Sequence, residues 1–95
     1  MPSVSRKGDL CSGHSCFPPR KSIEGSDNVF INGIPAHRLD DKWEQHGCGT
    51  CSPHDGVLAK GSSTVFVNGK PLARVGDDVS CGSKVAEGSS DVFAG

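Results

Sequence analysis

One stretch of sequence occurs twice in this chain, at residues 25–41 and 61–77. Each copy reads Gly-Ser, then Val-Phe-x-Asn-Gly, then Pro-x-x-Arg, and closes on an Asp. A unit of this length cannot bury a hydrophobic face alone, so its repetition predicts several copies packed around a shared interior.

The two ends of the chain supply the parts of a third copy. Residues 88–95 start the unit with Gly-Ser-Ser-Asp-Val-Phe, and residues 1–9 finish it with Arg-Lys-Gly-Asp. If the ends meet, three copies surround a pseudo-threefold axis within a single domain, residues 1–95, and closure removes exposed strand edges. The alternative is a tandem duplication in an open sheet.

The sequence favours an all-β fold with little or no helix. Asn32-Gly33 and Asn68-Gly69 each lie between apolar residues, which is the strongest short signal for a β-hairpin. No segment keeps a helical period of apolar residues, because Gly, Pro and Ser interrupt every window. A short turn at residues 41–45 is the one candidate for helix, and residues 10–24 and 40–60 are expected to be loops.

The composition limits the classes of function. The chain has 95 residues, of which 34% are hydrophobic, so its core is marginal and a covalent or metal crosslink is expected. A net charge of -1 with scattered signs argues against a nucleic-acid partner. No apolar run marks a membrane span or a signal peptide, so we expect synthesis as a soluble protein in the cytoplasm.

Candidate metal ligands follow the closing Asp of each copy. His14, His46 and Cys81 lie five, five and four positions after their respective Asp residues, and His54 adds a fourth ligand from the longest loop. Threefold placement would bring them together at one end of the axis. Three imidazoles and one thiolate suit a closed, structural tetrahedral zinc site, with iron as the alternative metal. Such a site would supply folding free energy that the small core lacks.

Other residues leave alternatives open. His37 reads as a solvated or hydrogen-bonded strand residue and is the reserve metal ligand. Trp43 is expected to cover the loops near the metal or to contact a partner. The Asp pairs at 40–41 and 77–78 are expected to cap local backbone rather than to do acid–base chemistry.

The remaining cysteines permit a different site. They could form a four-cysteine zinc ribbon, and the C-x-x-C pair could be a redox dithiol, which would make the chain a soluble adaptor or redox module. They could also pack as small apolar residues or pair with each other. These cysteines are Cys11, Cys16, Cys48 and Cys51.

The composite pattern resembles the proline-alanine-alanine-arginine (PAAR) repeat proteins. The resemblance rests on Pro35-Ala36-His37-Arg38 and Pro71-Leu72-Ala73-Arg74, each following Val-Phe-x-Asn-Gly, and covers essentially the whole chain. It implies a small, sharp β cone with a zinc held near the apex by three His and one Cys. The chain departs from the family pattern at His37 and Leu72, where Ala is usual, and at Asp40, where the second copy has Gly76.

The resemblance also implies a function. Such cones are non-enzymatic tips that cap the trimeric β-helical spike of contractile injection machines, either type VI secretion systems or contractile phage tails. One copy would bind each trimer, of the valine-glycine-repeat or phage central spike type, through the base of the cone. The tip would be assembled into a phage tail baseplate or secreted with the type VI spike, and would contact the target membrane transiently.

Overall fold

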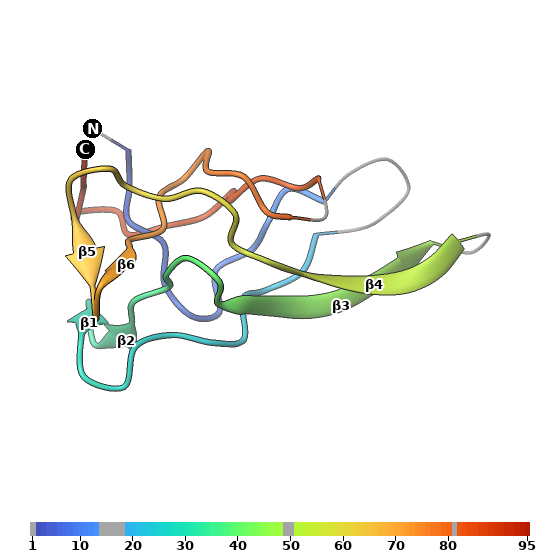
Figure 1. Cartoon of the computed structure of the whole chain (residues 1–95), viewed down its shortest axis with the longest axis horizontal. Helices are drawn as coiled ribbons and strands as arrows, with labels where there is room; N and C mark the ends of the chain where they lie inside the picture. The colour runs from blue at the N-terminus through green and yellow to red at the C-terminus, as the bar shows by residue number, and fades with distance from the viewer. Residues whose placement is uncertain (1, 14–18, 49–50, 81) are drawn as a thin grey trace.

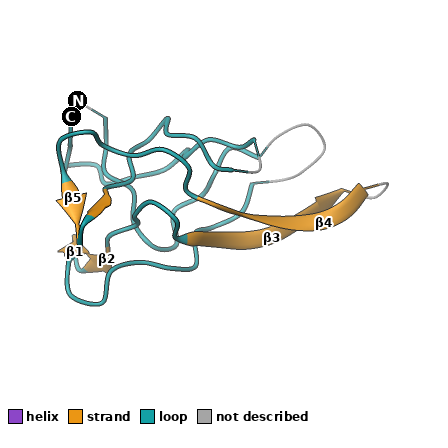
Figure 2. Cartoon of the chain, viewed as in Figure 1, coloured by secondary structure: helices purple, strands orange, loops and turns teal. Residues whose placement is uncertain are grey.

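The computed structural model contains six strands in three antiparallel pairs (Figure 1). The pairs are β1 (Phe30–Ile31) with β2 (Ile34–Pro35), β3 (Lys42–Cys48) with β4 (Cys51–Val57), and β5 (Phe66–Val67) with β6 (Lys70–Pro71). The structure describes residues 2–13, 19–48, 51–80 and 82–95, and none of these is helical. Most of the chain between the strands is irregular (Figure 2). The predicted all-β fold is confirmed.

One local prediction was wrong. Residues 42–45 of the helix candidate are the first four residues of strand β3, and the expected loop 40–60 is largely the long β3–β4 ribbon. Trp43 pairs with Gly56 across this ribbon. Tertiary pairing overrides a local pattern that contains Gly and Pro. The described part of the chain contains no helix long and apolar enough to cross a membrane.

The two short hairpins follow the turn chemistry of their sequences. Asn32 and Asn68 both have φ of 54°, and Gly33 and Gly69 follow at 77° and 78°. Positive φ at both central residues is the requirement of a type I′ turn, which Asn-Gly meets at low cost. The predicted hairpins are confirmed.

The two ends of the chain lie together in the same arrangement. Ser3 forms an antiparallel bridge with Phe93. The equivalent pair in the first hairpin is Pro35 with Phe30. Val4 N–H donates to the carbonyl of Val92 at 3.0 Å, and the corresponding bonds in the other two hairpins measure 3.0 and 3.1 Å. Both termini therefore lie at the end of the molecule that carries β1–β2 and β5–β6 (Figure 1). We call this end the wide end.

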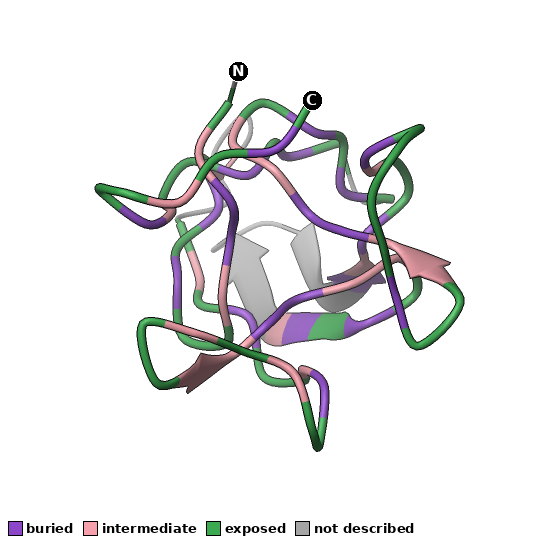
Figure 3. Cartoon of the chain, turned by 90° about the vertical axis from the view of Figure 1, so that its left-hand side faces the viewer, coloured by how far each residue is buried: buried purple, intermediate pink, exposed green. Residues whose placement is uncertain are grey.

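A closed ring of backbone hydrogen bonds joins the three units. Ser5 N–H donates to Ala73 O at 2.9 Å, Ala73 N–H to His37 O at 2.9 Å, and His37 N–H to Ser5 O at 3.3 Å. All three residues are completely buried. The flanking bridges are cyclic too: Val4–Arg74, Arg6–Ala36 and Arg38–Leu72. The chain consequently surrounds one central axis (Figure 3).

An Arg–Asp pair closes each unit just beyond this ring. In every pair the Arg backbone N–H and Nε both donate to Asp Oδ2, while Nη2 donates to Oδ1. The pairs are Arg6–Asp9, Arg38–Asp41 and Arg74–Asp77. Fork-shaped, partly buried pairs of this kind are stronger than exposed ion pairs. The predicted backbone-capping role of Asp41 and Asp77 is confirmed.

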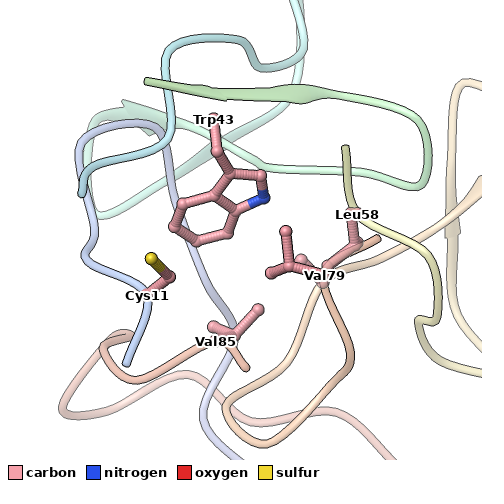
Figure 4. Packing of buried hydrophobic residues seen from close by; sticks show 6 residues of the cluster. Cys11, Trp43, Leu58, Val79 and Val85 are labelled. Carbon is pink, nitrogen blue, oxygen red and sulfur yellow. The ribbon is translucent and has the colours of Figure 1, made fainter. Parts of the chain in front are cut away.

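The core consists of two layers along the axis. The layer nearer the wide end comprises Val4, Ala36, Val67, Leu72 and Ala94. The second comprises Cys11, Trp43, Leu58, Ala73, Val79 and Val85 (Figure 4). Trp43 lies across this second cluster and is only 2% exposed, so its expected position as a cover over the loops was wrong. Trp43, Cys11 and Val79 each follow the closing Asp of a unit by two positions.

The residue before the Asp of each Arg–Asp pair has a backbone conformation that L side chains rarely adopt. Gly8, Asp40 and Gly76 hold equivalent positions with φ of 96°, 71° and 95°. A Cβ added to Gly76 would meet no atom within 4 Å, so only the backbone conformation opposes a side chain there. We predict that Gly76→Ala lowers the free energy of unfolding by about 1–2 kcal/mol, measured by urea denaturation.

Asp40→Gly is the matched variant. Asp tolerates positive φ better than Ala, and a new Gly also adds freedom to the unfolded chain, so we expect a gain no larger than about 1 kcal/mol. Loss of stability in Asp40→Gly, or no change in Gly76→Ala, would contradict this interpretation.

Candidate functional site

Two of the four predicted metal ligands lie on one ribbon. His46 in β3 and His54 in β4 are directly opposite one another in the antiparallel register. His14 and Cys81 lie outside the described residues.

The loops that carry the predicted ligands start from neighbouring stems. Each stem is a pair of bridged positions on either side of the loop: Leu10–Lys21, Lys42–Val57 and Asp78–Lys84. Adjacent stems are bridged in turn, through Cys11–Val85, Ser22–Trp43 and Leu58–Val79. All three loops therefore leave the second core layer side by side, at the end opposite the wide end (Figure 1).

The donor chemistry at this end fits zinc. Neutral imidazole and thiolate are its preferred protein ligands, and two imidazoles from one ribbon would supply half of a tetrahedral set. Within the described part of the chain, no group of three or more His, Cys, Asp or Glu is placed to hold a metal ion. The complete set of His14, His46, His54 and Cys81 stays a prediction.

Cys11 belongs to the core rather than to a surface site. It is free, only 2% exposed, and packed in the second core layer. Its Sγ accepts a hydrogen bond from the backbone N–H of Arg20 at 3.3 Å. This is the environment of a packed thiol, and it disfavours the ribbon that would use Cys11. Cys16 lies outside the described residues, and Cys48 and Cys51 are opposite one another where β3 and β4 meet.

His37 is held inside the molecule and not with the ligand loops. Its Nδ1 lies 2.8 Å from the carbonyl oxygen of Glu24, to which it donates, and its ring meets Trp43 edge to face at 4.9 Å. The hydrogen-bonded reading of His37 is confirmed and the solvated one is wrong. Burial is the main cause that lowers the His37 pKa, against weaker raising effects from Glu24 and Asp41.

The wide end carries a feature that sequence reasoning did not assign to residues. Phe30, Phe66 and Phe93 hold equivalent positions in the three units and are 53%, 56% and 48% exposed. Three exposed aromatic side chains at equivalent positions make this end the candidate interaction surface. The signal was present in the sequence, because the Phe of Val-Phe alternates outward from the buried face of each hairpin.

The comparisons with known proteins agree with this architecture. A family model described as PAAR motif matches residues 48–95, which are 48 of the 95 residues. The match includes β4, the β5–β6 hairpin and residues 88–95, which form the first part of the third unit. No curated protein matches the chain.

His37 predicts an acid-sensitive core. The unfolded chain binds a proton at His37 near pH 6.5, whereas the folded chain, with its lowered pKa, binds it at lower pH. The stability that depends on neutral His37 is therefore complete above pH 6.5 and is lost as the pH falls below it.

The His37→Phe variant isolates this effect, because it keeps a ring against Trp43 but cannot titrate. On acidification, the unfolding free energy of the wild type should fall relative to that of this variant, by at most about 1.4 kcal/mol per pH unit. Parallel stability curves from pH 7.5 to pH 5 for the two proteins would show that His37 does not titrate in this way.

Proposed function

Because the chain belongs to the PAAR-motif family of spike-tip proteins in contractile injection systems, we propose that it is a non-enzymatic tip. It caps and sharpens a trimeric β-helical spike and helps to puncture the envelope of a target cell. The observation that carries this proposal is the closed ring of Ser5, His37 and Ala73. It gives one chain the approximate threefold symmetry that a trimeric spike presents at its blunt end.

The wide end is the proposed docking face. Phe30, Phe66 and Phe93 would each enter one of three equivalent apolar sites on the trimer, and burial of a Phe side chain contributes about 1.5–3 kcal/mol. The short hairpins also offer strand edges through which a partner's strands can continue. One copy of this chain per trimer satisfies the symmetry of both partners.

The opposite end is the proposed apex. His14, His46, His54 and Cys81 would hold a structural zinc ion there, with iron as the alternative. The metal would supply folding free energy and tie together the three loops that carry these residues. A tip under load needs slow unfolding, which a closed β core and a metal crosslink both favour.

The expected setting follows from this role. We propose that the protein is made in the bacterial cytoplasm and then assembled on a phage tail baseplate or exported with a type VI spike. Contact with the target membrane would be transient. The net charge of -1 gives no electrostatic reason for a nucleic-acid partner.

The docking face is tested by binding to purified trimeric spike proteins of the valine-glycine-repeat and phage central spike types. We expect one of these to bind, and each single change of Phe30, Phe66 or Phe93 to Ala to weaken binding by about tenfold, since buried aromatic anchors cost more than 1 kcal/mol when truncated. Affinity would be measured by biolayer interferometry, with stoichiometry by light scattering.

Ile23→Ala provides the matched control. Ile23 is 43% exposed, but it lies beside the stem of β3, where its N–H donates to Lys42 O at 3.0 Å. Its truncation should leave binding unchanged. Equal losses in Ile23→Ala and the Phe variants, or no binding to any trimeric spike, would remove the support for this docking face.

The apex is tested by metal analysis of the purified chain. We expect one zinc per chain by native mass spectrometry, lost in His14→Ala, in Cys81→Ser and in the double variant His46→Ala/His54→Ala. Cys11→Ser should keep the metal because Cys11 is packed in the core. Release of zinc by Cys11→Ser or Cys48→Ser, with retention in His14→Ala and Cys81→Ser, would favour the cysteine site instead.

A further inference from the structure

The units are latched to one another at the wide end by their turn residues. Asn32 Oδ1 accepts from Ser89 Oγ at 2.5 Å and from Arg6 Nη1 at 3.3 Å, while its Nδ2 donates to Asp91 Oδ1 at 2.9 Å. All three partners belong to the unit formed by the chain ends. The side-chain amide of Asn32 is therefore held at both of its polar atoms.

Asn68 makes the equivalent contacts with the first unit. Its Oδ1 accepts from Ser26 Oγ at 2.6 Å and from Arg38 Nη1 at 3.0 Å, and its Nδ2 donates to Asn28 Oδ1 at 2.9 Å. The two latches differ in one group. The Nδ2 of Asn32 faces a carboxylate, whereas the Nδ2 of Asn68 faces a neutral amide that can turn to present its own N–H groups.

Both latches are built from Asn-Gly, the sequence most open to spontaneous loss of the side-chain amide, because Gly leaves its own backbone nitrogen unhindered. In this reaction the nitrogen of Gly33 attacks Cγ of Asn32, a C–N bond forms, and Nδ2 leaves as ammonia with the proton from that nitrogen. Water then opens the cyclic imide. Opening at Cγ gives aspartate, and opening at the backbone carbonyl carbon gives isoaspartate, in which the chain continues through the side chain.

We propose that Asn32 is a modification site of this chain, at which folding suppresses deamidation and deamidation in turn unlatches the wide end. We attribute the suppression to the latch, because the bonds to Ser89, Arg6 and Asp91 restrain the side-chain rotation on which attack by the Gly33 nitrogen depends. Loss of two to three hydrogen bonds corresponds to a protection of about tenfold or more in rate.

The unlatching follows from the charge. An aspartate at position 32 cannot donate to Asp91, and it places a second carboxylate against the first. The hydrogen bond from Asn32 is the largest cause that lowers the Asp91 pKa, ahead of the bond from Ser89. Its loss removes a contact between units beside Phe93, and isoaspartate would further break the type I′ turn. Arg6 offsets part of the repulsion.

Position 68 is the internal comparison. An aspartate there would still accept from Ser26 and Arg38, and Asn28 could donate to it. Among the described residues, no carboxylate is a hydrogen-bond partner of the Asn68 side chain, whose partners are Ser26, Arg38 and Asn28. The same chemistry at Asn68 is therefore expected to be tolerated.

The first experiment measures rates. The full chain is incubated at mildly alkaline pH, folded or in urea, and deamidation at each Asn is followed by peptide mapping. We expect both sites to react at least about tenfold faster in urea. Ser89→Ala should accelerate Asn32 alone, and Ser26→Ala should accelerate Asn68 alone. Equal rates in the folded and unfolded chains would overturn the proposal.

The second experiment uses variants that mimic the product and does not depend on a serine variant that folds. Asn32→Asp should lower the thermal unfolding midpoint more than Asn68→Asp does. It should also raise the Asp91 pKa, measured by NMR titration of its carboxyl carbon, while Asn68→Asp leaves that pKa unchanged. Equal midpoints, or an unchanged Asp91 pKa in Asn32→Asp, would refute the unlatching. Neither experiment involves a spike partner, so its failure is separable from that of the proposed function.

Discussion

The backbone ring of Ser5, His37 and Ala73 is the constraint on which the rest of the structure depends. A chain of this size cannot stabilise three separate hairpins, because isolated two-stranded pairs are marginal in water. The ring connects them by main-chain bonds that need no particular side chain, and it leaves no free edge at the axis. The Arg–Asp pairs then fix the direction in which each unit leaves the ring.

Crowding at this ring explains a pattern of small residues. Gly25, Gly61 and Gly88 pass directly over the ring segments, where an added Cβ would lie 2.8, 2.9 and 2.7 Å from its nearest atom. The following Ser of each unit folds its hydroxyl back onto the backbone of the same turn and also reaches the turn of another unit. The Gly-Ser start of the repeat is thus a requirement of closure.

Much of this could be read from the sequence, and the failures have physical causes. Asn-Gly specifies its turn locally, so both hairpins were predictable. The β3–β4 ribbon was not, since its strands contain Gly and Pro and are selected by pairing and not by propensity. Trp43 was not predicted in the core, and core packing was only one of the alternatives for Cys11, because the burial of both residues depends on how the units stack. The position of His46 opposite His54 also depends on the pairing of β3 with β4, which the sequence did not predict.

A single chain can do at the axis what a homotrimer cannot. Three identical subunits must place identical residues around the axis, whereas this chain places His37 opposite Ser5 and Ala73 and fills the next layer with Trp43 on one side only. The same freedom lets one loop grow into a ribbon. The ribbon places His46 and His54 at directly opposite backbone positions, an arrangement that, in the described part of the chain, only one of the three units has. The wide end keeps the approximate threefold arrangement, and the departures from symmetry collect toward the opposite end.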